Sequence, residues 1–90
     1  MAAYTVRILK AASRELEKLD KSAGRRVIDR IRWLAENAGE AKLQALKGDL
    51  SGLYKLREGD YRIIYEIIRK ENVILVHSIG HRREVYQRRK

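Results

Sequence analysis

The sequence predicts a single α+β domain over residues 1–90, of order βααβββ, with two N-terminal helices packed on a mainly antiparallel four-stranded sheet. Three observations lead to this prediction. Residues 4–9 alternate apolar and polar side chains with period two, which is typical of a half-buried strand. Apolar residues then recur at helical spacing from Ala12 to Ala35. Beyond a connection at residues 40–48, period two returns. Helices followed by a run of strands indicate an α+β fold.

Two helices are predicted between the first strand and the connection. In the first helix, Ala12, Leu16 and Leu19 recur at i, i+4 and i+7 with charged residues between them. Ser22 is predicted to cap the second helix, because a serine side chain can accept a hydrogen bond from the first turn. That helix should end at residues 37–39. Its predicted apolar face consists of Val27, Ile28, Ile31, Leu34 and Ala35.

The C-terminal half is predicted to be sheet, with strands at residues 52–57, 61–68 and 73–79. Glu58-Gly59-Asp60 has the composition of a tight hairpin turn, because glycine is free to adopt positive φ. Residues 69–72 form the second predicted turn. The last strand is so uniformly apolar that a central strand covered on both faces is expected.

Composition excludes several classes of function. The chain has no cysteine, so it can form neither a disulfide framework nor a thiolate site, and this fits a reducing, cytoplasmic location. No apolar run could span a bilayer, and no membrane association is expected. The formal net charge is +9, and residues 81–90 hold five Lys or Arg against one Glu. By charge alone, this basic end would attract nucleic acid, an acidic protein segment or an anionic membrane equally well.

Lys55, Arg57 and Arg62 are predicted to point to one face of two adjacent antiparallel strands. Cations on the outer face of a sheet are commonly only solvated surface. The functional interpretation is a phosphate clamp, because guanidinium groups bind phosphate bidentately and offset charge in a phosphoryl transition state. Both interpretations stay open on the pattern alone.

Residues 80–86 leave the last predicted strand with a second set of candidates. Gly80 lets the backbone turn, His81 can exchange a proton near neutral pH, and Arg82 and Arg83 can hold phosphate. Tyr86 can stack on an unpaired base. The alternative is a charged tail that packs on the sheet edge.

His77 and His81 have the spacing of two zinc ligands on a helix, but they lie in a predicted strand. Four residues of strand span roughly 13 Å, too far for two imidazoles to share one tetrahedral ion. No metal and no other cofactor is therefore expected. Trp33 lies one place off the apolar face of the second helix, so it is either partly core or an anchor for a partner.

Two segments together resemble the RelE/ParE superfamily of toxin-antitoxin toxins, and the RelE branch is the closer likeness. Residues 46–66 read LKGDLSGLYKLREGDYRIIYE, and residues 80–86 read GHRREVY. The predicted order of elements also agrees with this RelE-like fold over nearly the whole chain. The resemblance implies a toxin that enters the ribosomal A site and cuts messenger RNA there.

In that family the cleavage needs no metal, since the ribose 2′-hydroxyl attacks the adjacent phosphate and leaves a cyclic phosphate. The resemblance also implies a cognate antitoxin, expected to be acidic and RelB-like, that silences the toxin in a hetero-oligomer. The implied partners of the active toxin are the ribosome and mRNA.

The resemblance assigns roles to residues at matching positions. Lys55 matches a lysine that activates the hydroxyl or neutralises the phosphate, and Arg62 matches the transition-state arginine. Arg82 matches the arginine near the leaving oxygen, Arg57 a supporting cation, and Tyr86 the tyrosine that stacks on the substrate base. Further substrate-binding cations are expected at Lys47 and Arg83.

The sequence departs from the RelE pattern at two positions. Leu53 stands where a second strand lysine would precede Lys55 by two residues, and His81 stands where a lysine often follows the glycine. An ordinary imidazole can accept a proton near neutral pH, whereas an ordinary lysine amine is protonated there. The general base is therefore either His81 or Lys55.

Two other functions remain open at this point. A ParE-like toxin would share the fold but inhibit DNA gyrase by protein contact, and it would not need Lys55, Arg62, Arg82 and Tyr86. A non-catalytic domain would bind only RNA or the antitoxin. Assays with translating ribosomes and with gyrase separate the three functions.

Overall fold

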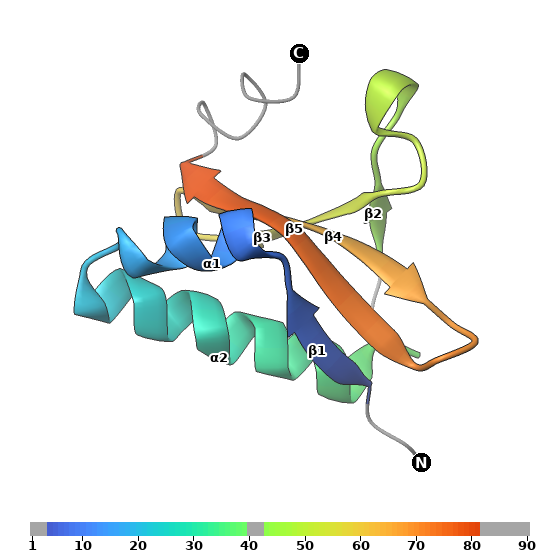
Figure 1. The fold of residues 1–90 in the computed structure, drawn as a ribbon, viewed down its shortest axis with the longest axis horizontal. Helices are drawn as coiled ribbons and strands as arrows, with labels where there is room; N and C mark the ends of the chain where they lie inside the picture. The colour runs from blue at the N-terminus through green and yellow to red at the C-terminus, as the bar shows by residue number, and fades with distance from the viewer. Residues whose placement is uncertain (1–3, 40–42, 82–90) are drawn as a thin grey trace.

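The computed structural model describes residues 4–39 and 43–81, and these form two α-helices and one five-stranded sheet (Figure 1). The predicted α+β order is confirmed. The elements are β1 (Thr5–Ile8), α1 (Lys10–Glu17), α2 (Lys21–Asn37), β2 (Gln44–Ala45), the 3-10 turn η1 (Gly48–Leu50), β3 (Tyr54–Glu58), β4 (Tyr61–Ile68) and β5 (Val73–His81). The strand beyond the predicted four is β2, whose two residues are too few to show a period in the sequence.

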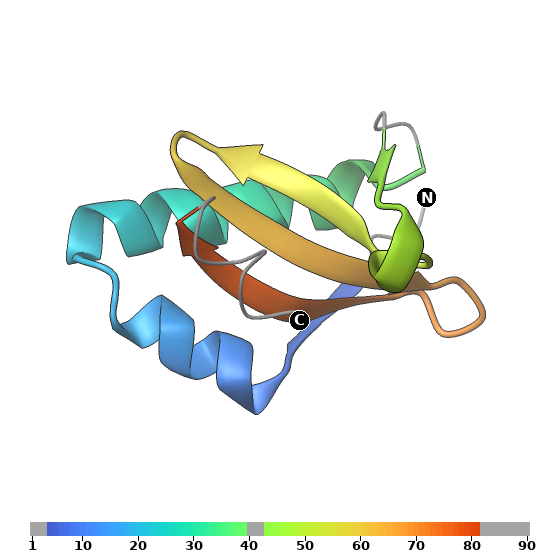
Figure 2. The same ribbon diagram turned by 90° about the horizontal axis from the view of Figure 1, so that it is seen from above.

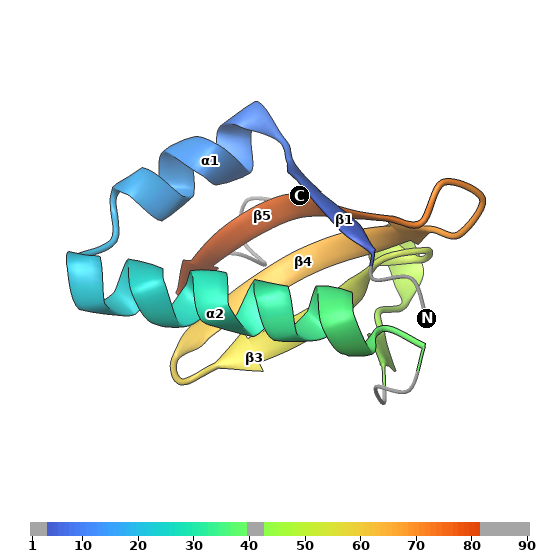
Figure 3. The same cartoon turned by 90° about the horizontal axis from the view of Figure 1, so that it is seen from below.

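The strand order in the sheet is β1-β5-β4-β3-β2, in which β1 runs parallel to β5 and all other neighbours are antiparallel. Helix α2 lies across one face of the sheet, and α1 lies along the β5 edge on that side, beyond the end of β1 (Figure 3). The opposite face, seen in Figure 2, carries Arg62, Ile64 and Glu66 of β4 and is termed the open face below.

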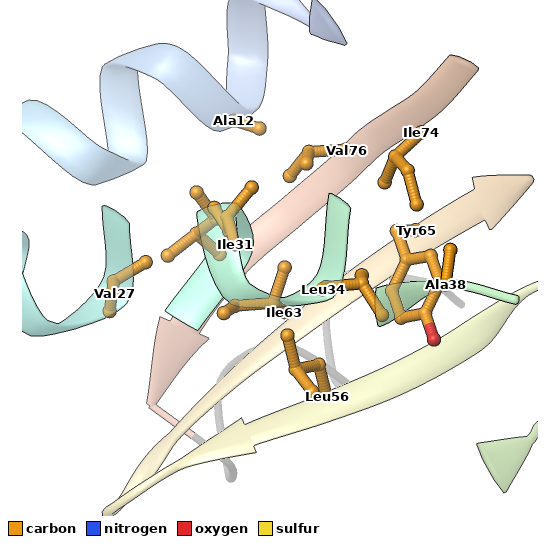
Figure 4. Close-up of a cluster of buried hydrophobic side chains, with 11 residues drawn as sticks. Ala12, Val27, Ile31, Leu34, Ala38, Leu56, Ile63, Tyr65, Ile74 and Val76 are labelled. Atoms are coloured by element: carbon orange, nitrogen blue, oxygen red, sulfur yellow. The ribbon is translucent and has the colours of Figure 1, made fainter. Parts of the chain in front are cut away.

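The core lies between this sheet and the helices, as the helical and period-two patterns predict (Figure 4). Its largest fully buried side chains include Leu34 of α2 and Ile63 and Tyr65 of β4. The prediction is wrong for one residue of the apolar face of α2, because Ile28 is 37% exposed. It lies where α2 faces the end of α1 and lines an open hollow there with Leu16 and Leu19, so neither helix covers it fully.

A smaller apolar cluster lies on the open face. Leu53 and Ile64 are buried there beneath Leu46, which precedes η1, and Leu50, its last residue. This loop covers part of the open face near β3. The prediction that β5 is covered on both faces is wrong for the residues described, because His77 on its open-face side remains partly exposed.

Helix α2 begins after Asp20, so the predicted cap at Ser22 is wrong. The Asp20 carboxylate accepts a hydrogen bond of 2.8 Å from the backbone N–H of Ala23. Ser22 lies inside the first turn, where its hydroxyl accepts a hydrogen bond from the guanidinium of Arg26. A carboxylate also interacts favourably with the positive end of the helix dipole, an advantage that serine lacks.

Replacing Asp20 with alanine should therefore destabilise the fold by about 1 kcal/mol, the usual effect of losing a helix cap. The free energy of unfolding in urea measures this. Ser22→Ala is the matched control and should change the stability much less. A larger loss in Ser22→Ala than in Asp20→Ala would contradict the assignment of the cap.

Helix α1 takes over from β1 as the neighbour of β5. The β1–β5 pairing ends at Ile8 and Val76, and the Leu9 N–H donates to the Val76 carbonyl. Farther along β5, the backbone N–H of Ile79 donates to Glu15 Oε1 of α1 at 2.8 Å. A helical side chain thus satisfies a strand donor that β1 is too short to reach. Neither described helix is long and apolar enough to cross a membrane.

Candidate nucleic-acid interface

The open face brings together three predicted cations. Arg57 of β3 lies directly opposite Arg62 of β4, and Lys55 lies opposite Ile64. Directly opposed residues have Cβ atoms about 5 Å apart, so the two arginines repel each other. Arg57 is exposed, and Lys55 and Arg62 are partly exposed. This arrangement presents concentrated positive charge to an anion above the sheet.

The guanidinium of Arg62 is held at the β3–β4 hairpin. Its Nη1 donates to the carbonyls of Tyr61 at 3.2 Å and Gly59 at 3.4 Å. Gly59 adopts φ of 59°, as the predicted hairpin turn requires. These bonds use one nitrogen of a group that has several N–H donors. Arg62 can therefore be positioned by the backbone and still bind a phosphate.

Two further cations lie outside this cluster. Lys47 is the residue before η1, between Leu46 and Leu50, which pack on the open face. Arg7 of β1 lies opposite Leu75 of β5 and is exposed. The only sequence signal for Arg7 was period two, which places it on the polar side of the first strand. Only the parallel pairing of β1 with β5 brings it to this sheet face.

His81 does not join the cluster of Lys55, Arg57 and Arg62. It pairs with Tyr61, whose side chain lies on the helix-covered face, and the two ring centroids are 6.3 Å apart. His81 lines a hollow together with residues of α1, among them Arg14, Glu15 and Lys18. The histidine predicted as a possible base is thus on the face opposite Lys55.

A β-bulge in β5 explains this placement. Ile64 pairs with Ser78 while Tyr65 pairs with Val76, so His77 is an extra residue between them. An extra residue reverses the alternation of faces for the rest of the strand. Without it, His77 and His81 would share a face.

The bulge also positions a pair of side chains that the sequence analysis missed. His77 Nε2 lies 3.0 Å from Glu66 Oε1 on the neighbouring strand. The side chains are 21% and 41% exposed, respectively. The sequence signal was a histidine and a glutamate on predicted neighbouring strands, but their contact depends on a register that the sequence does not show.

Arg82, Arg83 and Tyr86 lie outside the described residues. The roles that the resemblance implies for them stay predictions.

Relieving the repulsion between Arg57 and Arg62 should stabilise the protein. Arg57→Thr is expected to raise the free energy of unfolding by up to about 1 kcal/mol, because a β-branched residue replaces a like charge directly opposite Arg62. Urea unfolding at low salt measures the gain, and it should shrink at high salt. Arg69→Thr in the β4–β5 turn is the control. Equal changes in both variants would show that the opposed charges carry no repulsion.

Comparisons with known proteins agree with this fold. The family model for the ParE toxin of the type II toxin-antitoxin system parDE matches residues 6–86. Toxin RelG of Mycobacterium tuberculosis is 27% identical over 85 residues, which cover 94% of this chain and 98% of RelG.

Solved structures of toxins have the same fold. The toxin-antitoxin complex RelBE2 from Mycobacterium tuberculosis matches with a TM-score of 0.82 at 28% identity, covering 91% of this chain and 94% of the matched chain. The isolated E. coli RelE toxin matches with a TM-score of 0.75 at 26% identity, covering 96% and 94%. The archaeal RelE-RelB complex from Pyrococcus horikoshii OT3 matches with a TM-score of 0.72 at 29% identity, covering 93% and 100%.

The family match begins at the second residue of β1 and extends past the end of β5, so it spans almost the whole described sheet. This chain therefore belongs to the RelE/ParE superfamily and is a toxin of a type II toxin-antitoxin system.

Proposed function

We propose that this toxin is a metal-independent, ribosome-dependent endoribonuclease that cuts messenger RNA in the ribosomal A site and so inhibits translation. The observation that carries the proposal is the cluster of Lys55, Arg57 and Arg62 on the open face, with two arginines directly opposed. Such a pair lowers stability unless a polyanion binds it, and proteins accept local costs of this kind chiefly at functional sites.

In the proposed reaction, the 2′-hydroxyl attacks the adjacent phosphorus and the bond to the 5′-oxygen breaks. Negative charge grows on the phosphate, and fixed cations offset it. Arg62 takes this part, with Arg57 as a supporting cation. Lys55 neutralises the phosphate or helps to activate the hydroxyl. Arg82 acts near the leaving oxygen.

The remaining residues bind the substrate or take part in proton transfer. Tyr86 stacks on the base, and Lys47 and Arg83 bind the RNA backbone. His81 stays a second candidate for the base, although its place on the helix-covered face supports it less than Lys55.

The proposed partner that silences the toxin is an acidic, RelB-like antitoxin. Two of the structural relatives are toxin-antitoxin complexes, RelBE2 and RelE-RelB. A net charge of +9 favours an acidic partner. Trp33 of α2 is 40% exposed, and Arg30 lies 4.3 Å over its ring, so it is a candidate anchor for the antitoxin. The toxin would act in the cytoplasm, where ribosomes translate.

One experiment tests the proposal against its alternatives. Purified toxin is added to ribosomes translating a defined message and, separately, to gyrase with plasmid DNA. Cuts at the codon in the A site, blocked by excess antitoxin, support the proposal. A second candidate, inhibition of gyrase, is favoured by the match to the ParE family model. Trapped gyrase complexes without RNA cuts would establish that candidate. If neither RNA cuts nor trapped gyrase were found, the protein would be a non-catalytic binding domain.

A further inference from the structure

The open face carries a histidine–carboxylate pair that the roles above leave unused. His77 is the bulged residue of β5, and its Nε2 lies 3.0 Å from Glu66 Oε1 of β4. Bulges commonly redirect a side chain next to an active site. Both side chains remain partly exposed, so an RNA strand lying on this face can reach them.

The pair lies beside the cation cluster. Ser78, the neighbour of His77, pairs with Ile64, and Ile64 pairs with Lys55. Two strand spacings therefore separate Lys55 from Ser78, about 10 Å between backbones. Lysine and histidine side chains can converge over such a distance on one phosphodiester group.

Glu66 lies next to the position at which the expected second lysine is missing. Continuing the register of Tyr54 and Tyr65 by one residue places Leu53 opposite Glu66. Leu53 is the position where the resemblance would put a second lysine. Leu53 is buried under the loop that carries Leu46 and Leu50. In this chain a hydrogen-bonded imidazole therefore occupies the neighbourhood in which a cationic amine is missing.

We propose that His77 is the proton acceptor for the 2′-hydroxyl and that Glu66 is its positioning residue. The inference rests on the proposed function. A proton on Nε2 directed to Glu66 leaves the lone pair of Nδ1 for the hydroxyl proton. As Nδ1 takes that proton, the 2′-oxygen bonds to phosphorus and the phosphorus–5′-oxygen bond breaks. The 5′-oxygen takes a proton from water, and His77 later returns its proton to solvent.

The charges around His77 suit this role. Glu66 on β4 stabilises the imidazolium that forms when the proton is taken up. Arg7 on β1 and Lys55 on β3 also face this side of the sheet. Helix α2 lies on the other face, and α1 lies along the β5 edge on that side. His81, on that other face, faces α1 instead.

Single-turnover cleavage on the ribosome, measured as a function of pH, tests the inference. His77→Gln keeps an amide that can donate to Glu66 but cannot accept the proton. We expect it to lower the cleavage rate by about 10²-fold or more, to abolish the fall in rate at acid pH, and to leave the toxin concentration for half-maximal rate nearly unchanged.

Glu66→Gln should reduce the rate less, by about 10-fold, and should move the fall in rate toward lower pH, because the imidazole loses its stabilising carboxylate. A purely structural role for Glu66 would not move the pH profile. Glu71→Gln in the exposed β4–β5 turn is the matched control and should leave both rate and profile unchanged. Thermal unfolding confirms that each variant is folded.

The outcomes separate this inference from the proposed function. If wild-type toxin cuts no message on the ribosome, the proposed function fails and the role of His77 fails with it. If the wild type cuts and His77→Gln keeps the wild-type rate and pH profile, only the role of His77 is overturned. If the fall in cleavage rate at acid pH were kept in His77→Gln but lost in His81→Gln or in Lys55→Met, the proton acceptor would be His81 or Lys55, respectively.

Discussion

Arg62→Ala is expected to lower the rate of mRNA cleavage by about 10²-fold or more while binding to the ribosome stays nearly intact. The physical reason is that charge on the phosphate grows in the transition state, so a fixed guanidinium stabilises that state more than the bound substrate. The carbonyls of Gly59 and Tyr61 hold Arg62 in place and thereby reduce the reorganisation needed during the reaction. Single-turnover kinetics on programmed ribosomes, together with a binding assay, measure the two effects separately.

Arg69→Ala is the matched control, because Arg69 lies in the exposed β4–β5 turn at the other end of β4. It removes the same charge and should leave cleavage unchanged. Arg82→Ala is predicted to behave like Arg62→Ala. If Arg62→Ala weakened ribosome binding as much as it slowed cleavage, Arg62 would only anchor RNA.

Alkaline pH is expected to destabilise the protein through Tyr65, by up to about 3 kcal/mol between pH 10 and pH 12. Burial raises the pKa of Tyr65 from 10.0 to about 12, and the neighbouring Tyr54 adds to the shift. The two rings stack with centroids 5.7 Å apart. Below pH 10 the phenol is neutral in both the folded and the unfolded chain. Between pH 10 and 12 the unfolded chain releases its proton first, so rising pH favours unfolding.

Urea unfolding at several pH values from 9 to 12 measures this loss. Tyr65→Phe is the control, because it keeps the ring in the core and removes the ionisable hydroxyl. Other groups that titrate in this range are the same in both proteins, so the difference between the two curves isolates Tyr65. Parallel loss of stability in both proteins would exclude this role for the buried phenol.

Much of the fold could be predicted because its patterns are local. The alternation of apolar residues on β4 and the helical stripe of Val27, Ile31 and Leu34 depend only on backbone periodicity, and the structure buries these residues as predicted. The short strand β2 could not be predicted, because two residues show no period. The cap at Asp20 was missed because both Asp20 and Ser22 are good caps in sequence.

The part of the candidate site that could be predicted also depends on local patterns. Period two and a tight glycine turn were enough to place Lys55, Arg57 and Arg62 on one face of the β3–β4 hairpin. These features are local, because alternation within a strand follows from the geometry of the extended backbone.

By itself, the sequence determined the α+β class, the order of the main elements and the basic face of the hairpin. Only the tertiary structure decided that Arg7 lies on that face and that His77, rather than His81, lies near Lys55. The physical reason is that strand pairing and the bulge at His77 depend on contacts between residues far apart in the chain. A single inserted residue reverses the faces of a strand, and no pattern within β5 alone reveals it.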